Sequence, residues 1–323
     1  MIPSPVNPAS CIRALAACAL AAASFVTTAQ TFPSRPVTII VPYAPGGAND
    51  VVSRVIATHL TTATGTSYVV DNRPGAYGNI GAGILAKSRP DGYTIGYLNA
   101  IHAVNNSFFK SVPFDLENDF IPLAEIGYSH VMFVMRPDAP FRTIPELIAY
   151  AKANPGKLNY GSAGSAHPIE MLKALTGLQV TTVPYKGFAP ALADLFGKRL
   201  DFLAGVNLDL MPHIRTGKVR PLAMTGTTRY KELPDVPTVA ETIPGFDSPQ
   251  WYGFFVPVKT PNDAVEVLRT ELLRARSNPA VTERLTAQGM DISPRGMEEF
   301  RRNLREDIGR WRDIARKGNI QYE

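Results

Sequence analysis

Two segments of the chain share one local design, an apolar strand followed by a glycine-rich turn and the start of a helix. The first covers residues 37–50, with Gly46 and Gly47 in its turn, and the second covers residues 158–168. The start of a helix carries unpaired backbone N–H groups and the positive end of the helix dipole, so it attracts anions. Glycine has no side chain, which lets a ligand approach that backbone closely. Two such turns predict two lobes that present N–H groups to one small anionic ligand.

Residues 1–29 have the pattern of a secretory signal. Arg13 precedes an apolar run from Ala14 to Val26, and small residues follow up to Ala29. The run is shorter than the roughly 20 apolar residues that span a bilayer. It therefore predicts a signal peptide, cleaved near Ala29, and a periplasmic location. A lipid anchor at Cys18 is the alternative, because the residues up to that cysteine also fit a lipobox.

Composition limits what the mature chain does. Both cysteines, Cys11 and Cys18, lie in the leader, so the rest of the chain offers no disulfide, thiolate nucleophile or cysteine-bound metal. The 323 residues, less the leader, are enough for two domains. The net charge of +5 falls by one with the loss of Arg13, and no block of like charge stands out. Nucleic-acid binding is therefore not expected.

Strand-like and helix-like segments alternate along the chain, which predicts an α/β architecture with largely parallel sheets. Val37 to Tyr43 is an apolar strand, and the helix after it has Asn49 or Asp50 as its expected N-cap. Further strands are expected at residues 67–70, 93–98, 131–135, 179–183, 200–204 and 219–224, and helices at 80–87, 144–153, 168–176, 189–196, 208–216, 262–276, 280–287 and 297–316.

Several short motifs occur in order along nearly all of the mature chain. They are Pro33–Pro36, Pro42–Asp50, Asn72–Gly81, Pro90–Thr94, Tyr160–Ser165, Val183–Gly187, Leu233–Thr238 and Trp251–Gly253. Each motif alone is weak, but so many in one order are specific. On these motifs the chain resembles the solute receptors of tripartite tricarboxylate transporters, the Bug family of periplasmic binding proteins.

The resemblance implies a two-lobed, type II-like periplasmic binding protein, in which two α/β domains joined by two crossover strands hold the ligand in the cleft between them. Residues 30–130 with 253–323 are expected to form domain 1, and residues 131–252 domain 2. Such a receptor passes a small carboxylate to the membrane permease subunits of a tripartite transporter. A receptor that reports to a membrane sensor kinase is the alternative. A monomer is expected.

The glycine turns and the resemblance together place the carboxylate against backbone N–H groups and ordered water. Hydrogen bonds from fixed amides to a carboxylate are charge-assisted, and bridging water lets one scaffold serve several acids. The first wall is expected at Tyr43, Ala44, Pro45, Gly46 and Gly47, and the opposing wall at Ser162, Ala163, Gly164 and Ser165.

Five further candidates near the predicted strand ends admit a structural as well as a binding role. Asn99, Ala100 and His102 follow a strand, where open α/β sheets bind ligands. His102 either donates to a carboxylate or is a structural histidine. Asn79 lines the cleft or caps a helix, and His167 contacts the ligand or caps the helix beside it.

The second half of the chain adds two more candidate segments. Lys186, flanked by Tyr185 and Gly187, either neutralises an acid across the cleft or lies on the surface. Gly205 stands where relatives often carry an acidic or other polar residue. The absence of that side chain would widen the pocket here. Asn207 is expected to take over part of that polar role.

The motifs of an exported enzyme are missing. The serines of Gly161–Ser165 are misplaced for a Gly-x-Ser-x-Gly elbow. Gly78–Gly83 is not a dinucleotide fingerprint, and a Gly-Lys-Ser/Thr phosphate loop does not occur. The five histidines show no metal spacing. We therefore expect neither catalysis nor a cofactor or metal.

The composition of the walls also predicts the kind of acid. Tyr43, Tyr77, Tyr185 and Phe188 offer an apolar surface, and Gly205 leaves space beside it. Such a wall favours one well-bound carboxylate with a hydrophobic or aromatic body over a compact amino acid, whose ammonium group would be desolvated and unpaired.

Overall fold

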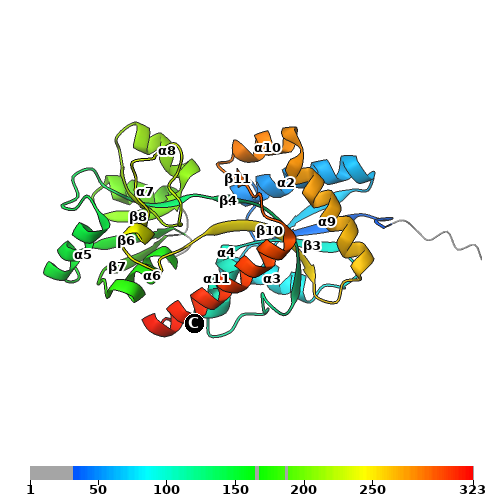
Figure 1. The fold of residues 1–323 in the computed structure, drawn as a ribbon, viewed down its shortest axis with the longest axis horizontal. Helices are drawn as coiled ribbons and strands as arrows, with labels where there is room; N and C mark the ends of the chain where they lie inside the picture. Colours follow the sequence, from blue (N-terminus) through cyan, green and yellow to red (C-terminus); the bar gives the residue numbers. More distant parts are fainter. Residues whose placement is uncertain (1–31, 164–166, 186–187, 323) are drawn as a thin grey trace, which may run out of the picture. The chain divides into compact units, whose positions relative to one another are not determined.

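The computed structural model describes residues 32–163, 167–185 and 188–322. Within them, two β-sheets with helices on their faces form the fold, which confirms the expected α/β class (Figure 1). The first sheet has the strand order β11-β4-β10-β3-β1-β2 and the second has the order β7-β6-β8-β5-β9. The first sheet comprises β1 Val37–Val41, β2 Tyr68–Asn72, β3 Thr94–Asn99, β4 Phe120–Ser129, β10 Gln250–Pro257 and β11 Asp291–Ile292. The second comprises β5 Val131–Met135, β6 Asn159–Ala163, β7 Thr181–Tyr185, β8 Phe202–Val206 and β9 Arg220–Met224.

The helices divide between the two sheets in chain order. Those that follow strands of the first sheet are α2 Ala48–Thr64, α3 Asn79–Ala86, α4 Ala100–Phe108, α9 Asn262–Ser277, α10 Pro279–Thr286 and α11 Met297–Gly318. Those that follow strands of the second are α5 Ile144–Ala153, α6 His167–Thr176, α7 Phe188–Phe196 and α8 Asn207–Arg215. Short 3-10 turns lie at Ala76–Gly78 (η1) and Val239–Glu241 (η2). No helix among the described residues is long and apolar enough to span a bilayer.

The expectation of largely parallel sheets is wrong. β1 pairs in parallel with β2 and β3, and β6 does so with β7 and β8. β10, however, runs antiparallel to both β3 and β4, β11 runs antiparallel to β4, and β5 runs antiparallel to β8 and β9. β5, with which the chain enters the second sheet, and β10, with which it returns to the first, therefore run antiparallel to the βαβ strands beside them. Both sheets are mixed.

The chain changes sheets at two places. β4 ends at Ser129 in the first sheet and β5 begins at Val131 in the second, so only His130 separates them. The return is made between the end of β9 at Met224 and the start of β10 at Gln250. The domain boundaries given above stay a prediction.

The start of α2 differs from the expected cap. Gly47 is the N-cap residue, with φ −78° and ψ 166°, and makes no side-chain cap hydrogen bond. Asp50 instead reaches back, and its Oδ2 accepts from the Gly46 N–H at 2.9 Å. Gly46 has φ +83°, a left-handed conformation that favours glycine. The turn is thus fixed by a carboxylate in the first helical turn rather than by a capping side chain.

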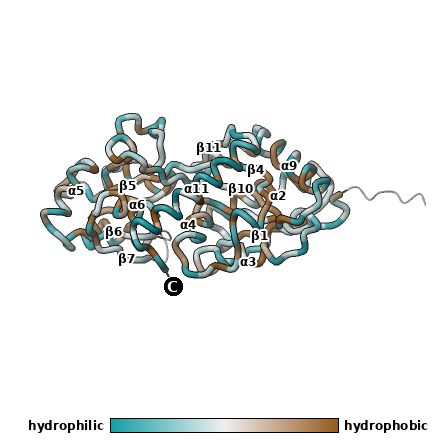
Figure 2. The backbone as a smooth tube through the Cα atoms, turned by 60° about the horizontal axis from the view of Figure 1, so that its bottom comes forward, coloured by the Kyte–Doolittle hydropathy of each residue, from teal (hydrophilic) through white to brown (hydrophobic). Residues whose placement is uncertain are grey.

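The C-terminal helix α11 packs on helices associated with both sheets. It contacts α4, which follows β3, and α6, which follows β6. Although many of its residues are hydrophilic (Figure 2), one stripe is buried and contains Phe300, Leu304, Ile308, Trp311 and Ile314. Burying that stripe on two sides ties the end of the chain to both halves of the fold.

Candidate functional site

A cavity of about 280 Å³ lies where strand ends of both sheets meet helix starts. We call it the helix-end cavity. Its lining residues are Tyr43, Ile101, Val131, His167, Pro168, Phe188, Ala204, Gly205, Val206, Asp209 and Gln250. Tyr43, His167, Phe188 and Gly205 were named from the sequence, and the structure brings these four together.

Four helices begin at this cavity. Ile101 is the second residue of α4, His167 is the first of α6, and Phe188 is the first of α7. Val206 is the N-cap of α8 and carries no side-chain cap. Because the first amides of each helix lack helical acceptors and the dipole end is positive, this convergence creates a strongly anion-attracting environment. It also lies at the carboxyl ends of β3, β6 and β8, where open α/β sheets bind ligands.

The first glycine turn supplies one wall through Tyr43. Its backbone oxygen accepts from Asn72 Nδ2 at 3.0 Å, and the same amide group donates to Asp50 Oδ1 at 2.9 Å. Burial raises the pKa of the Tyr43 phenol well above its usual range, so the hydroxyl stays protonated. Ala44, Pro45, Gly46 and Gly47 are exposed. They are not among the described residues that line the helix-end cavity.

The candidates at the end of β3 form a buried capping network. Asn99 is the N-cap of α4, and its Oδ1 accepts from the Ile101 N–H at 3.1 Å. His102 Nδ1 accepts from the Asn99 N–H at 3.2 Å, and burial lowers the pKa of His102 to about 4, so the ring is neutral. Asn79 Oδ1 accepts from Asn105 Nδ2 at 2.7 Å. These contacts favour the structural role for Asn79, Asn99 and His102, as they do for Ala100, the buried first residue of α4.

The second glycine turn is only partly described. Ser162 is buried in β6 and lines a neighbouring cavity of about 340 Å³. The Ala163 backbone pairs with Tyr185 of β7. Gly164, Ser165, Lys186 and Gly187 lie outside the described residues, so their roles stay predictions. Tyr185 donates from its hydroxyl to Asp194 Oδ2 at 2.7 Å, which occupies that group away from the helix-end cavity.

Gly205 and Asn207 differ from the expectation in an informative way. A Cβ at Gly205 would lie 2.5 Å from Phe188 Cε2, so the space that glycine leaves is taken by the Phe188 ring. Asn207 is buried, its N–H donates to His130 O at 2.8 Å, and the helix-end cavity is not lined by it. Asp209, two residues later, lines the cavity instead. Burial raises the pKa of its carboxyl.

Sequence analysis missed Ile101 and Gln250 in this cavity. Ile101 belongs to α4, which follows β3 without a loop and so gives no turn signal. Gln250 begins the returning strand β10, and nothing local distinguishes it from a surface glutamine. The proximity of both to Tyr43 depends on contacts between distant parts of the chain.

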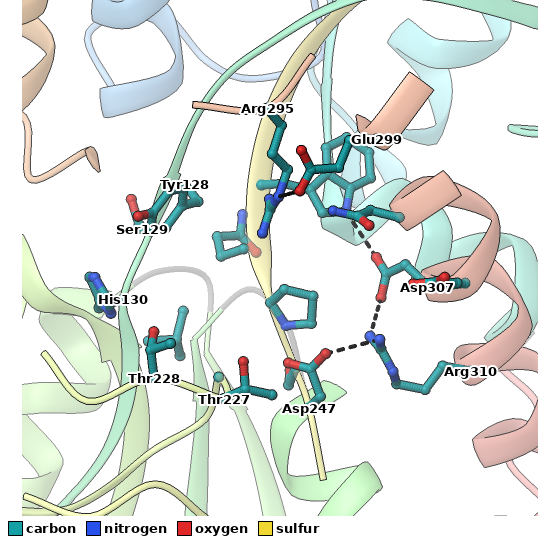
Figure 3. Close-up of a pocket in the computed structure, with 18 of the residues that line it drawn as sticks. Tyr128, Ser129, His130, Thr227, Thr228, Asp247, Arg295, Glu299, Asp307 and Arg310 are labelled. Carbon is teal, nitrogen blue, oxygen red and sulfur yellow. Dashed lines mark hydrogen bonds and ion pairs between the residues drawn. The ribbon is translucent and has the colours of Figure 1, made fainter. Parts of the chain in front are cut away.

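A larger cavity of about 460 Å³ lies beside the two crossing segments (Figure 3). Several of its charged groups form ion pairs. Arg310 joins Asp247 and Asp307, each at 2.9 Å, and Trp251 Nε1 donates to Asp307 Oδ2 at 2.8 Å. Arg295 reaches Glu125 Oε1 at 2.7 Å. This network holds α11 against the segment that enters β10.

Asp307 gives this network a pH dependence. Burial raises the pKa of its carboxyl to about 7, whereas an unfolded aspartate titrates near 3.9. Folding thus favours the neutral form of Asp307. The stability that this form contributes to the fold is lost as pH rises from about 4 through 7. We expect the free energy of unfolding of the wild type, relative to Asp307→Asn, to fall by about 2 kcal/mol between about pH 5 and pH 7. Chemical denaturation followed by tryptophan fluorescence measures it, and equal pH profiles for the two proteins would contradict the assignment.

Comparison with known proteins identifies the family. Residues 52–320 match the family described as "Tripartite tricarboxylate transporter family receptor". Protein BugT of Bordetella pertussis is 34% identical over 301 residues, covering 90% of this chain and 91% of that protein. A structure of an R. palustris protein with adipate has a TM-score of 0.77 at 33% identity, covering 90% of this chain and 100% of the other. MatC from Rhodopseudomonas palustris with bound malate has a TM-score of 0.76 at 30% identity, covering 88% and 100%. The fold is that of the periplasmic solute-binding proteins, and the chain belongs to the tripartite tricarboxylate transporter receptor family.

Proposed function

We propose that this protein is a periplasmic receptor that captures a small organic carboxylate in the helix-end cavity and delivers it to the membrane permease of a tripartite transporter. The observation that carries the proposal is the convergence of four helix starts on one cavity of about 280 Å³. A carboxylate there accepts charge-assisted hydrogen bonds from backbone amides. The adipate and malate complexes of similar proteins support this class of ligand.

The amides of the β1–α2 turn complete the proposed grip. The Gly46 N–H is already engaged by Asp50, and residues 44–47 do not line the helix-end cavity. The first amides of α2, beginning beside Gly47, therefore reach the anion only when the lobes close over it. Tyr43 from the same turn lines the cavity. The turn therefore acts as a preorganised set of hydrogen-bond donors. In this proposal the protein is a receptor rather than an enzyme.

Closure of the two lobes over the ligand is part of the same proposal. The lobes would be residues 30–130 with 253–323 and residues 131–252, with the two crossing segments as the hinge. The changes of sheet at His130 and before Gln250 support that division. Closure excludes water and strengthens each charge-assisted bond.

Isothermal titration of the mature chain tests the proposal. Malate, adipate, benzoate and 3-phenylpropanoate form the panel, and adipamide serves as the uncharged control for adipate. We expect at least one acid to bind with a stoichiometry of about one and adipamide not to bind. A folded protein that binds none of the acids, or binds adipamide as well as adipate, would overturn the proposal.

Asp209 sets a testable electrostatic limit on binding. Its carboxylate lines the cavity and repels a ligand carboxylate, so Asp209→Asn should tighten malate binding about fivefold near neutral pH. Because the pKa of Asp209 is raised, the wild type loses this repulsion as pH falls toward that pKa, and the two affinities should converge. Asp263→Asn is the matched control, since Asp263 is also in the first turn of a helix, α9. Weaker malate binding by Asp209→Asn would mean that Asp209 accepts a ligand hydroxyl.

A further inference from the structure

A second cavity adjoins the helix-end cavity and differs from it in chemistry. This aromatic cavity has a volume of about 340 Å³. Its walls include Tyr77, Val104, Phe108, Phe109, Pro184 and Tyr322. Ile101 and His167 line both cavities, so the two spaces are neighbours that share these side chains.

The described walls of the aromatic cavity carry no charged side chain. Two of the polar side chains near it bond to protein atoms. Asn105 Nδ2 donates to Tyr77 O at 3.0 Å and to Asn79 Oδ1 at 2.7 Å, and Thr182 Oγ1 accepts from Lys173 Nζ at 2.7 Å. Burial lowers the pKa of His167 to about 3, so its ring is neutral. An ion or a strongly polar group would lose its hydration here without replacement.

The aromatic rings of the walls are arranged as a cluster. Ring centroids lie 5.7 Å apart for Tyr77 and Phe109, 5.5 Å for Phe109 and Tyr322, and 5.7 Å for Phe108 and Tyr322. Tyr77 is held with φ +57°, in the left-handed region that a tyrosine rarely adopts. Its backbone oxygen accepts from Asn105. Strain of this kind persists where the surroundings fix it, and it is common at ligand sites.

We propose that the aromatic cavity binds the apolar body of the ligand while the carboxylate lies in the helix-end cavity. The ligand class is then an organic acid that carries a group of about the size of a benzene ring. A cavity of about 150 Å³ lined by apolar side chains already accommodates benzene, so the volume here is ample. This inference rests on the proposed function, because it needs the carboxylate to be held next door.

Titration with a series of acids tests the inference. Benzoate, phenylacetate and 3-phenylpropanoate are compared with malate, and L-phenylalanine shows whether an α-ammonium group is accepted. We expect the tightest of the three aromatic acids to bind at least about tenfold more tightly than malate. If malate binds and every aromatic acid binds equally or more weakly, the inference fails while the proposed function stands. If no acid binds, the proposed function itself fails.

Val104→Phe fills the cavity from a residue that does not line the helix-end cavity. We expect the affinity for the preferred aromatic acid to fall about tenfold and that for malate to change less than about twofold. Val104→Ala is the matched control and should retain the aromatic acid within about threefold. Phe109→Ala, which removes another part of the wall, tests the same point without adding volume, should Val104→Phe unfold. Equal losses for malate and the aromatic acid in the folded variants would overturn the assignment.

Discussion

Gly47→Val is expected to weaken binding of the cognate acid by at least about 100-fold, or about 2.8 kcal/mol, without unfolding the protein. Gly47 has φ −78°, which valine adopts readily, and the nearest atom to a new Cβ would be Ala44 O at 3.7 Å. The fold therefore tolerates the side chain. The ligand does not, because the two branches of valine would cover the first amides of α2 that are proposed to hold the carboxylate.

The chain provides a close control for this variant. Gly296 is the N-cap of α11 with φ −77° and ψ 174°, and a Cβ added there would have no neighbouring atom within 4 Å. Gly296→Val thus makes the same change at the same helix position, far from Tyr43 in the sequence. Titration should show unchanged affinity for Gly296→Val and nearly complete loss for Gly47→Val, with similar melting temperatures. Normal affinity in Gly47→Val would show that the glycine turn is not a wall of the site.

Arg295→Met is expected to lower the free energy of unfolding by about 3 kcal/mol near pH 8. The side chain of Glu125 is fully buried, and Arg295 supplies its ion pair at 2.7 Å. Removing the arginine leaves a buried carboxylate without its counter-charge, which costs more than the pair contributes when intact. Urea denaturation at several pH values measures the loss.

The pH dependence of that loss identifies its cause. Burial already raises the pKa of Glu125 against the opposing charge of Arg295, and the variant should raise it further. A carboxyl whose folded pKa is raised loses stability as pH rises from its unfolded pKa to its folded pKa, so the deficit should shrink as pH falls back through that range toward about 5. Glu125→Gln in the Arg295→Met background should recover most of the stability. Arg301→Met removes an exposed pair with Glu298 and should cost less than about 0.5 kcal/mol; an equal cost at both positions would contradict the argument.

Local patterns predicted the elements that have clear boundaries. β5 and α5 match the expected ranges residue for residue. α5 does so because Thr143 Oγ1 caps it by accepting from the Glu146 N–H and because Asn154 ends it. α4 was missed, since it follows β3 directly and its polar residues Asn105 and Asn106 obscure the helical pattern. β4 was missed as well, with Pro122 interrupting an otherwise apolar strand.

The directions of the strands and the set of residues that line each cavity depend on contacts between segments far apart in the sequence. Nothing within β10 indicates that it pairs antiparallel with both β3 and β4. The helix-end cavity joins Tyr43 to Asp209, and the aromatic cavity joins Tyr77 to Tyr322, across most of the chain. Turn chemistry pointed to Tyr43, and the difference from relatives pointed to Gly205. The same chemistry could not separate His167, which lines both cavities, from His102, which is buried in a cap.

The position of β10 has a consequence for the order in which the molecule is assembled. β10 lies between β4 and β3 in the interior of the first sheet, yet it is made of residues 250–257. The strands β1 to β4, synthesised early, cannot form that sheet until most of the polypeptide exists. Contacts of such long sequence separation form slowly. Folding of the first sheet is therefore delayed in a chain that is exported unfolded. The strands that leave the ribosome first cannot complete their sheet until β10 has been synthesised.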